Sequence, residues 1–164
     1  TVDGLKTGYT SAAGYCLVAS AKKDGQRLIS VVLGAASTEA RAQESQKLIT
    51  YGMRFFETHL LYDAEEIVTE ARVWGGAEDY MELMLENEIA VTIPRGQAKY
   101  IKATMDMNNG IEAPLSAGDV LGKLVITLDT DVILERDLVA SKDMLEGGFF
   151  KGIADSAKRL ISGE

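Results

Sequence analysis

Two short runs rich in apolar and β-branched residues define the start of the chain. They are residues 14–21 (GYCLVASA) and 27–34 (RLISVVLG), and the Asp-Gly pair between them favours a tight hairpin turn. Apolar side chains fall on both faces of each run, which is typical of a sheet covered on both sides. The pattern therefore predicts two antiparallel strands in a covered sheet.

A helical pattern follows the second run. Ser37 or Thr38 can cap the helix, Glu39 lies in its first turn, and apolar or small residues recur at helical spacing as far as Phe56. This helix can cover one face of the sheet, but the sequence offers no second cover. We therefore expect residues 1–58 to be the C-terminal part of a larger α/β domain of antiparallel strands plus a helix, whose upstream half is missing from this sequence.

After His59 the pattern changes to short β runs separated by turn residues. The runs are residues 67–74, 88–93, 100–107, 121–128 and 131–140. They predict an all-β domain over residues 59–146. Residues 147–164 return to helical spacing and predict a terminal amphipathic helix. Its apolar face includes Phe149, Phe150, Ile153, Leu160 and Ile161. The expected fold class is α+β.

Composition and charge exclude several classes of function. The 17 basic and 25 acidic side chains give a net charge of −8, which argues against a general nucleic-acid binder. A single cysteine, Cys16, excludes an intramolecular disulfide, and a single histidine, His59, excludes the usual histidine-rich zinc sites. We assign no metal and no cofactor. Residues 57–91 carry one basic and ten acidic side chains, which most simply form a solvated face.

The most informative short motif is Lys6-Thr7-Gly8, which ends a third predicted strand beside the hairpin. A lysine ammonium attracts an anionic substrate and supports proton transfer, and a threonine hydroxyl can bind a carboxylate. Glycine lets a substrate backbone lie against the edge of the strand. As an isolated tripeptide, the motif is equally compatible with chance or with a simple turn.

The context of the motif resembles the low-molecular-mass penicillin-binding proteins that act as D-alanyl-D-alanine carboxypeptidases. The resemblance covers essentially the whole chain in order. It includes residues 2–10 (VDGLKTGYT), 13–15, 17–21, 27–30 followed by Gly34, 52–57 (GMRFFE), 92–96 (TIPRG) and 113–115, and the terminal helix. Tyr9 departs from the family, whose members often have histidine after the glycine. The departure leaves catalysis plausible and the local substrate contacts open.

The resemblance implies a serine acyl-transfer enzyme that removes the terminal D-Ala of peptidoglycan stem peptides and is acylated by β-lactams. The serine and its lysine would lie upstream of Thr1. The catalytic residues in this chain would be Lys6 and Thr7. The substrate-binding residues would be Gly8, Tyr9, Thr10 and Arg41. Arg41 would hold the terminal carboxylate of the peptide, whereas on sequence alone it can also be a solvated helix residue.

The resemblance also implies that the terminal helix attaches the protein to the periplasmic face of the cytoplasmic membrane. Docking of this helix against its own domain is the alternative. Ser20-Ala21-Lys22-Lys23 fits Ser-x-x-Lys, but it lies where a strand enters a turn, so we treat the match as accidental. Cys16 is expected to be a packed small hydrophobe and His59 a residue at the domain boundary.

Two other functions remain open at this stage. One is a non-catalytic binding or spacer module near the membrane, in which the Lys-Thr-Gly strand has no active role. The other is a serine β-lactamase, which shares the strand motif but not the β-rich sequence that follows Glu57.

Overall fold

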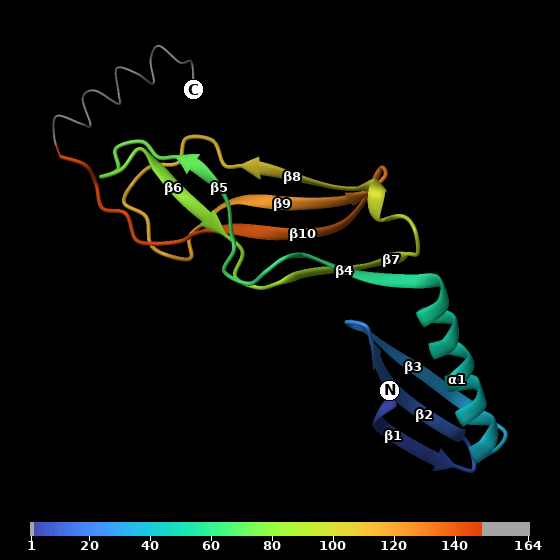
Figure 1. Cartoon of the computed structure of the whole chain (residues 1–164). Coiled ribbons are helices and arrows are strands. Elements are labelled where there is room, and N and C mark those ends of the chain that lie inside the picture. Colours follow the sequence, from blue (N-terminus) through green and yellow to red (C-terminus); the bar gives the residue numbers. More distant parts are fainter. Residues whose placement is uncertain (1, 149–164) are drawn as a thin grey trace. The chain divides into compact units, whose positions relative to one another are not determined.

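The computed structural model describes residues 2–148 and is divided into two compact units (Figure 1). The first unit contains residues up to His59 together with Val91–Ala98, and the second contains Leu60–Ala90 and the residues from Lys99 onward. The terminal amphipathic helix, with the apolar positions Phe149, Phe150, Ile153, Leu160 and Ile161, lies outside the described residues.

The first unit contains a three-stranded antiparallel sheet. Its strands are β1 (Val2–Thr10), β2 (Gly14–Lys23) and β3 (Gln26–Ala35), in the order β1-β2-β3. Asp24 and Gly25 connect β2 to β3 with φ values of 49° and 80°. Positive φ at both central residues matches the right-handed twist of a hairpin. The hairpin predicted from the Asp-Gly pair is therefore confirmed.

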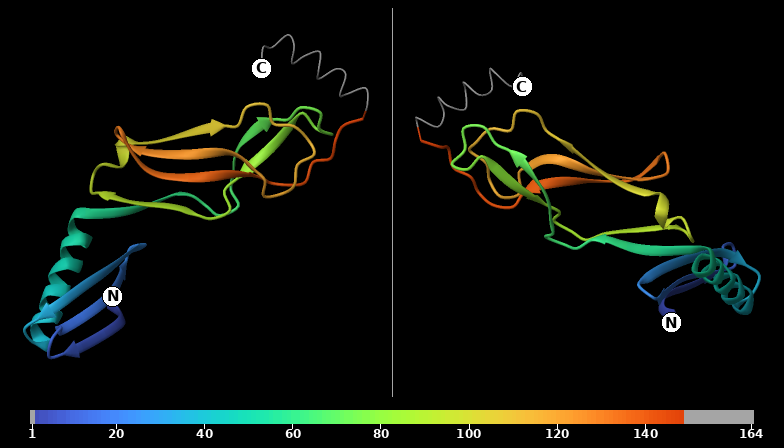
Figure 2. Two further views of the ribbon diagram at one scale, coloured as in Figure 1. Left: turned by 180° about the vertical axis from the view of Figure 1, so that it is seen from behind. Right: turned by 45° about the horizontal axis from the view of Figure 1, so that its top comes forward.

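Helix α1 (Thr38–Phe55) lies along one face of this sheet (Figure 2). Ser37 caps it by accepting a hydrogen bond from the amide of Ala40 at 3.1 Å. Ile49 packs with Ala19 and Ala21 of β2 in a small apolar core. The opposite face of β3 is open within the described residues: Ile29, Val31 and Leu33 are 62%, 56% and 73% exposed.

Val91–Ala98 group with the first unit, although they lie within residues 59–146, for which the sequence predicts an all-β domain. The reason is pairing: β7 (Ile89–Pro94) forms a two-stranded sheet with β4 (Phe56–Tyr62), which follows α1 directly. Strand β4 was not predicted from the sequence, because its residues begin the acid-rich part of the chain.

The second unit is built on a five-stranded antiparallel sheet in the order β5-β6-β10-β9-β8. The strands are β5 (Ile67–Arg72), β6 (Tyr80–Met84), β8 (Ile101–Met107), β9 (Val120–Leu128) and β10 (Asp131–Ala140), and a 3-10 turn (Ala98–Tyr100) precedes β8. Its most deeply buried side chains are Val73, Met81, Leu83, Leu85, Leu124, Ile126 and Leu138. A mostly β-sheet protein with one described helix agrees with the all-β part of the predicted α+β fold.

Candidate functional site

The Lys6-Thr7-Gly8 motif lies in the middle of β1, which is an edge strand in the described structure. Lys6 is opposite Val18, Thr7 is opposite Leu17, and Gly8 is opposite Cys16. Successive side chains of a strand point to opposite faces, so Lys6 and Thr7 lie on different sides of β1. Thr7 shares its side with Leu17, which packs against the core beneath α1. The edge of β1 that does not pair with β2 therefore has the Lys6 side chain on one side and the Thr7 side chain on the other.

Two polar side chains of β1, those of Lys6 and Thr10, have local partners. The Lys6 ammonium donates to the carbonyl oxygen of Thr7 at 2.7 Å, and its side chain is exposed. The hydroxyl of Thr10 accepts a hydrogen bond from the amide of Ala13 at 2.9 Å, which closes the turn between β1 and β2. Thr10 therefore has a structural role in this turn, and its role in substrate binding stays a prediction.

Arg41 connects α1 to the motif strand. It lies in the first turn of the helix, and its Nη1 donates to the carbonyl oxygens of Gly8 at 3.2 Å and Cys16 at 3.1 Å. These two residues are cross-strand partners, so the guanidinium bridges β1 and β2. The cap at Ser37 determines where the helix begins and thereby places Arg41 beside Gly8.

Two tyrosines stand next to this arginine. The rings of Tyr9 and Tyr15 are 4.4 Å apart at their centroids, and the Cζ of Arg41 lies 5.7 Å from the centroid of Tyr15. Tyr9 was predicted as a site residue from the sequence, whereas Tyr15 was not. Tyr15 could have been predicted from its position, because Tyr9 and Tyr15 lie at equal distances on either side of the β1–β2 turn and are therefore paired across the two strands.

A mostly apolar cavity of about 530 Å³ lies between β1 and α1. Its lining includes Leu5, Thr7, Leu17, Ala42 and Ile49. It is open to solvent in the described structure, so the apolar surface of β1 and α1 is only partly buried. The first unit thus presents apolar surface on both faces of its sheet.

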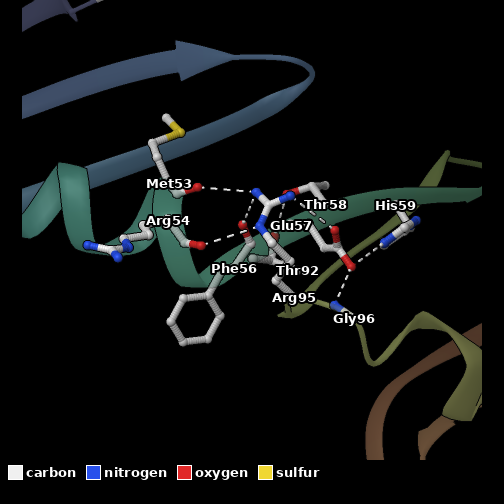
Figure 3. Close-up of polar contacts among 9 residues, drawn as sticks. All are labelled: Met53, Arg54, Phe56, Glu57, Thr58, His59, Thr92, Arg95 and Gly96. Carbon is white, nitrogen blue, oxygen red and sulfur yellow. Dashed lines mark hydrogen bonds and ion pairs between the residues drawn. The ribbon is translucent and has the colours of Figure 1, made fainter.

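A second group of polar contacts lies at the other end of α1 (Figure 3). The guanidinium of Arg95 donates to the carbonyl oxygens of Met53 and Phe56, both at 3.2 Å, and to that of Arg54 at 3.3 Å. These carbonyls have no partner within the helix, so Arg95 satisfies the end of α1 and its charge complements the helix dipole. Arg95 is a residue that sequence reasoning missed as a structural determinant.

Glu57 completes this second group. Its Oε1 accepts a hydrogen bond from the amide of Gly96 at 2.9 Å and lies 3.3 Å from Nε2 of His59, while its Oε2 lies 3.4 Å from Arg95. The Gly96 hydrogen bond, with His59 and Arg95 nearby, lowers the pKa of the Glu57 carboxyl. The arrangement joins the end of α1 to residues 95–96 and contains no group poised for nucleophilic attack.

The other sequence candidates lie in β2. Ser20 and Lys23 both lie on β2, so they are not one turn apart on a helix. Ser20 is also buried, and its hydroxyl contacts the guanidinium of Arg27. Cys16 is a free, half-buried thiol. Among residues 2–148, no group of three or more His, Cys, Asp or Glu side chains could hold a metal ion. No helix of that same stretch is long and apolar enough to cross a membrane.

Two family models match consecutive parts of the chain. Residues 1–37 match the family described as D-alanyl-D-alanine carboxypeptidase, and residues 56–146 match the C-terminal domain of penicillin-binding protein 5. The second match alone covers more than half of the chain.

Individual relatives agree with these matches. The chain is 43% identical over 162 residues to the D-alanyl-D-alanine carboxypeptidase DacA of Escherichia coli, covering 98% of this chain and 40% of the relative. It is 37% identical to DacF of Bacillus subtilis, over 90% of this chain and 38% of the relative. The crystal structure of penicillin-binding protein 5 from Haemophilus influenzae superposes with a TM-score of 0.83 at 39% identity, over 88% of this chain and 43% of that one. The chain thus spans about 40% of the length of the curated relatives that it matches.

Proposed function

We propose a function from the premise that the chain belongs to the D-alanyl-D-alanine carboxypeptidase family of penicillin-binding proteins. The protein removes the terminal D-Ala from peptidoglycan pentapeptides, and β-lactams acylate the same serine. The observation that supports this proposal is the exposed edge strand that carries Lys6-Thr7-Gly8, with Arg41 bound across it. No cofactor takes part in this chemistry.

In the proposed reaction, a serine outside these 164 residues attacks the carbonyl of the penultimate D-Ala. The amide bond breaks, the terminal D-Ala leaves with a proton on its nitrogen, and water then hydrolyses the acyl-enzyme. Lys6 supplies positive charge and takes part in proton transfer, since its ammonium is exposed at the edge of the strand. Gly8 has no side chain, so the substrate backbone can lie along β1.

The terminal carboxylate of the substrate is the group that Thr7 and Arg41 bind in this proposal. Arg41 uses Nη1 for the two backbone carbonyls, and within the described part of the chain its Nε and Nη2 have no hydrogen-bond partner. These two nitrogens form one side of the guanidinium fork, which is suited to a bidentate carboxylate. Tyr9 and Thr10 extend the binding surface along β1 beyond Gly8.

The upstream half of the catalytic domain is the partner that the first unit requires in this proposal. The exposed apolar face of Ile29, Val31 and Leu33 and the cavity between β1 and α1 support it, because surfaces of this kind are normally buried. The proposed domains are the C-terminal part of the catalytic domain over residues 1–58, an all-β domain over residues 59–146 and an amphipathic membrane-anchor helix over residues 147–164.

The proposed location is the periplasmic face of the bacterial cytoplasmic membrane. The support is the helical spacing of Phe149, Phe150, Ile153, Leu160 and Ile161 together with the basic residues between them. A helix of this kind binds a membrane surface reversibly, and anionic lipid strengthens the attachment. The attachment is peripheral in this proposal.

Intact-protein mass spectrometry of the full-length gene product, with and without benzylpenicillin, tests the proposed function. One covalent adduct, together with release of free D-Ala from a peptide ending in D-Ala-D-Ala, is the expected result. A full-length protein that forms no adduct and releases no D-Ala would contradict the proposal in favour of a non-catalytic module. Rapid loss of the adduct with accumulation of hydrolysed penicillin would instead indicate a β-lactamase.

A further inference from the structure

The two tyrosines beside Arg41 are the sequence neighbours of its hydrogen-bond acceptors on β1 and β2. Gly8 and Cys16, whose carbonyl oxygens accept from Arg41, are one cross-strand pair of β1 and β2. Tyr9 and Tyr15 are the next pair toward the turn. Two adjacent cross-strand pairs therefore provide both the acceptors and the aromatic rings around one guanidinium.

The rings of Tyr9 and Tyr15 contact each other, and the guanidinium of Arg41 lies over the ring of Tyr15. The centroid of Tyr9 lies 4.4 Å from that of Tyr15 with the planes inclined by 36°, and Arg41 Cζ lies 5.7 Å from the centroid of Tyr15. This last distance is within the range of cation–π attraction, which is about 6 Å. Tyr15 is half-buried, whereas Tyr9 is 58% exposed, so Tyr9 covers the outer side of Tyr15.

An arginine that must bind a carboxylate loses conformational freedom when the ligand arrives. A guanidinium that is already fixed before binding avoids most of this loss. The carbonyl oxygens of Gly8 and Cys16 hold Nη1 of Arg41. The Tyr15 ring, on one side of the guanidinium, restricts rotation of the guanidinium plane. The nitrogens that are left without a partner in the described structure then keep one orientation.

We propose that the stacked pair of Tyr9 and Tyr15 positions Arg41 for the terminal carboxylate of the substrate, with Tyr15 as the positioning residue. This inference rests on the proposed function. Tyr15 acts through Arg41 and does not touch the reacting atoms. Because the contact uses the ring and not the hydroxyl, phenylalanine can replace Tyr15 and leucine cannot.

The test measures acylation of the full-length gene product by a D-Ala-D-lactate depsipeptide and by its methyl ester, which lacks the carboxylate. The variants are Tyr15→Leu, Tyr15→Phe, Arg41→Gln and the double variant of Tyr15→Leu with Arg41→Gln. We expect Tyr15→Leu to lower kcat/KM for the free carboxylate about five- to tenfold, the size expected for loss of one cation–π contact. Tyr15→Phe should stay within about twofold of the parent protein.

A double-mutant comparison separates positioning from a general structural role. If Tyr15 acts through Arg41, Tyr15→Leu has no further effect once Arg41 is glutamine, and it leaves the methyl ester rate unchanged. An equal loss with the methyl ester, or the same loss in the Arg41→Gln background, would overturn the inference. So would a parental rate in Tyr15→Leu while Arg41→Gln is impaired, and that result would leave the proposed function standing. A parent protein that reacts with neither compound would overturn the proposed function itself.

Discussion

Arg41 Nη1 and the carbonyl oxygen of Gly8 are 3.2 Å apart, and this hydrogen bond connects residues that are 33 positions apart in the sequence. It joins the first turn of α1 to the strand that carries Lys6-Thr7-Gly8. A shift of the helix start therefore changes the position of the guanidinium relative to the edge of β1. The geometry of the proposed carboxylate site depends on the helix cap as well as on the motif.

Replacement of Lys6 by alanine should strongly reduce acylation by benzylpenicillin. The proposed reaction uses the Lys6 ammonium for charge stabilisation and proton transfer, and loss of such a group typically costs about 10²-fold or more in rate. Acylation kinetics of the full-length gene product provide the measurement. Lys23→Ala, at the exposed end of β2, is the matched control and should leave the rate unchanged. A near-normal rate in Lys6→Ala would remove Lys6 from the mechanism.

Replacement of Arg41 by lysine should weaken substrate binding more than turnover. Lysine keeps the positive charge but cannot bridge Gly8 and Cys16 and also present a bidentate fork. We expect KM for a D-Ala-D-Ala peptide to rise about tenfold while kcat changes about twofold or less. Steady-state kinetics of D-Ala release check this. An unchanged KM would mean that Arg41 does not hold the carboxylate.

The fold was largely predictable where local signals agree. The Asp24-Gly25 turn and the Ser37 cap are local chemistry, and the structure has the hairpin and the helix where these residues predict them. Strand β6 was missed because its alternation of Met81 and Leu83 with Glu82 is short and lies inside the acid-rich segment. The charge pattern there was interpreted as a solvated surface, although one side of the strand is fully buried.

Contacts between distant parts of the sequence were not predictable in the same way. The role of Tyr15 depends on the register of β1 and β2, which pairs it with Tyr9, and on the start of α1, which brings Arg41 over its ring. Arg95 binds carbonyl oxygens of Met53 and Phe56 across about 40 residues of sequence. No pattern within either segment indicates the other, so only the folded chain reveals these contacts.

The Glu57 carboxyl should contribute to stability in a pH-dependent way. Hydrogen bonding from the Gly96 amide, with His59 and Arg95 nearby, lowers its pKa in the folded protein. Its stabilising contribution is therefore fully present above the ordinary glutamate pKa of about 4.3 and is lost as the pH falls through the lowered folded value. Urea unfolding at several pH values should show a smaller decline below about pH 4.3 for Glu57→Gln than for the parent protein.

A control on the second unit makes this measurement specific. Glu70→Gln changes an exposed carboxyl on β5, in the other unit, and should retain the parental pH dependence. If Glu57→Gln and the parent protein lose stability in parallel as the pH falls, the hydrogen bond from Gly96 does not contribute to the acid response.

Attachment to a membrane surface should depend on the terminal apolar positions. Substitution of Phe149, Phe150 and Ile153 by serine removes most of the apolar area that the predicted helix could insert into the interface, so binding should fall about tenfold or more. Co-sedimentation with vesicles containing anionic lipid measures the bound fraction. Serine substitutions at Val132 and Ile133, two exposed apolar residues of β10, provide the control and should leave binding unchanged.

The lipid composition then distinguishes the two ways in which this segment could act. A surface-bound basic helix loses affinity when anionic lipid is replaced by zwitterionic lipid, because Lys151, Lys158 and Arg159 no longer gain electrostatic energy. A segment that docks on its own protein would give equal, low sedimentation for the parent protein and the serine variant on either surface. That result would contradict the proposed attachment, while the predictions for Lys6 and Arg41 would stand independently of it.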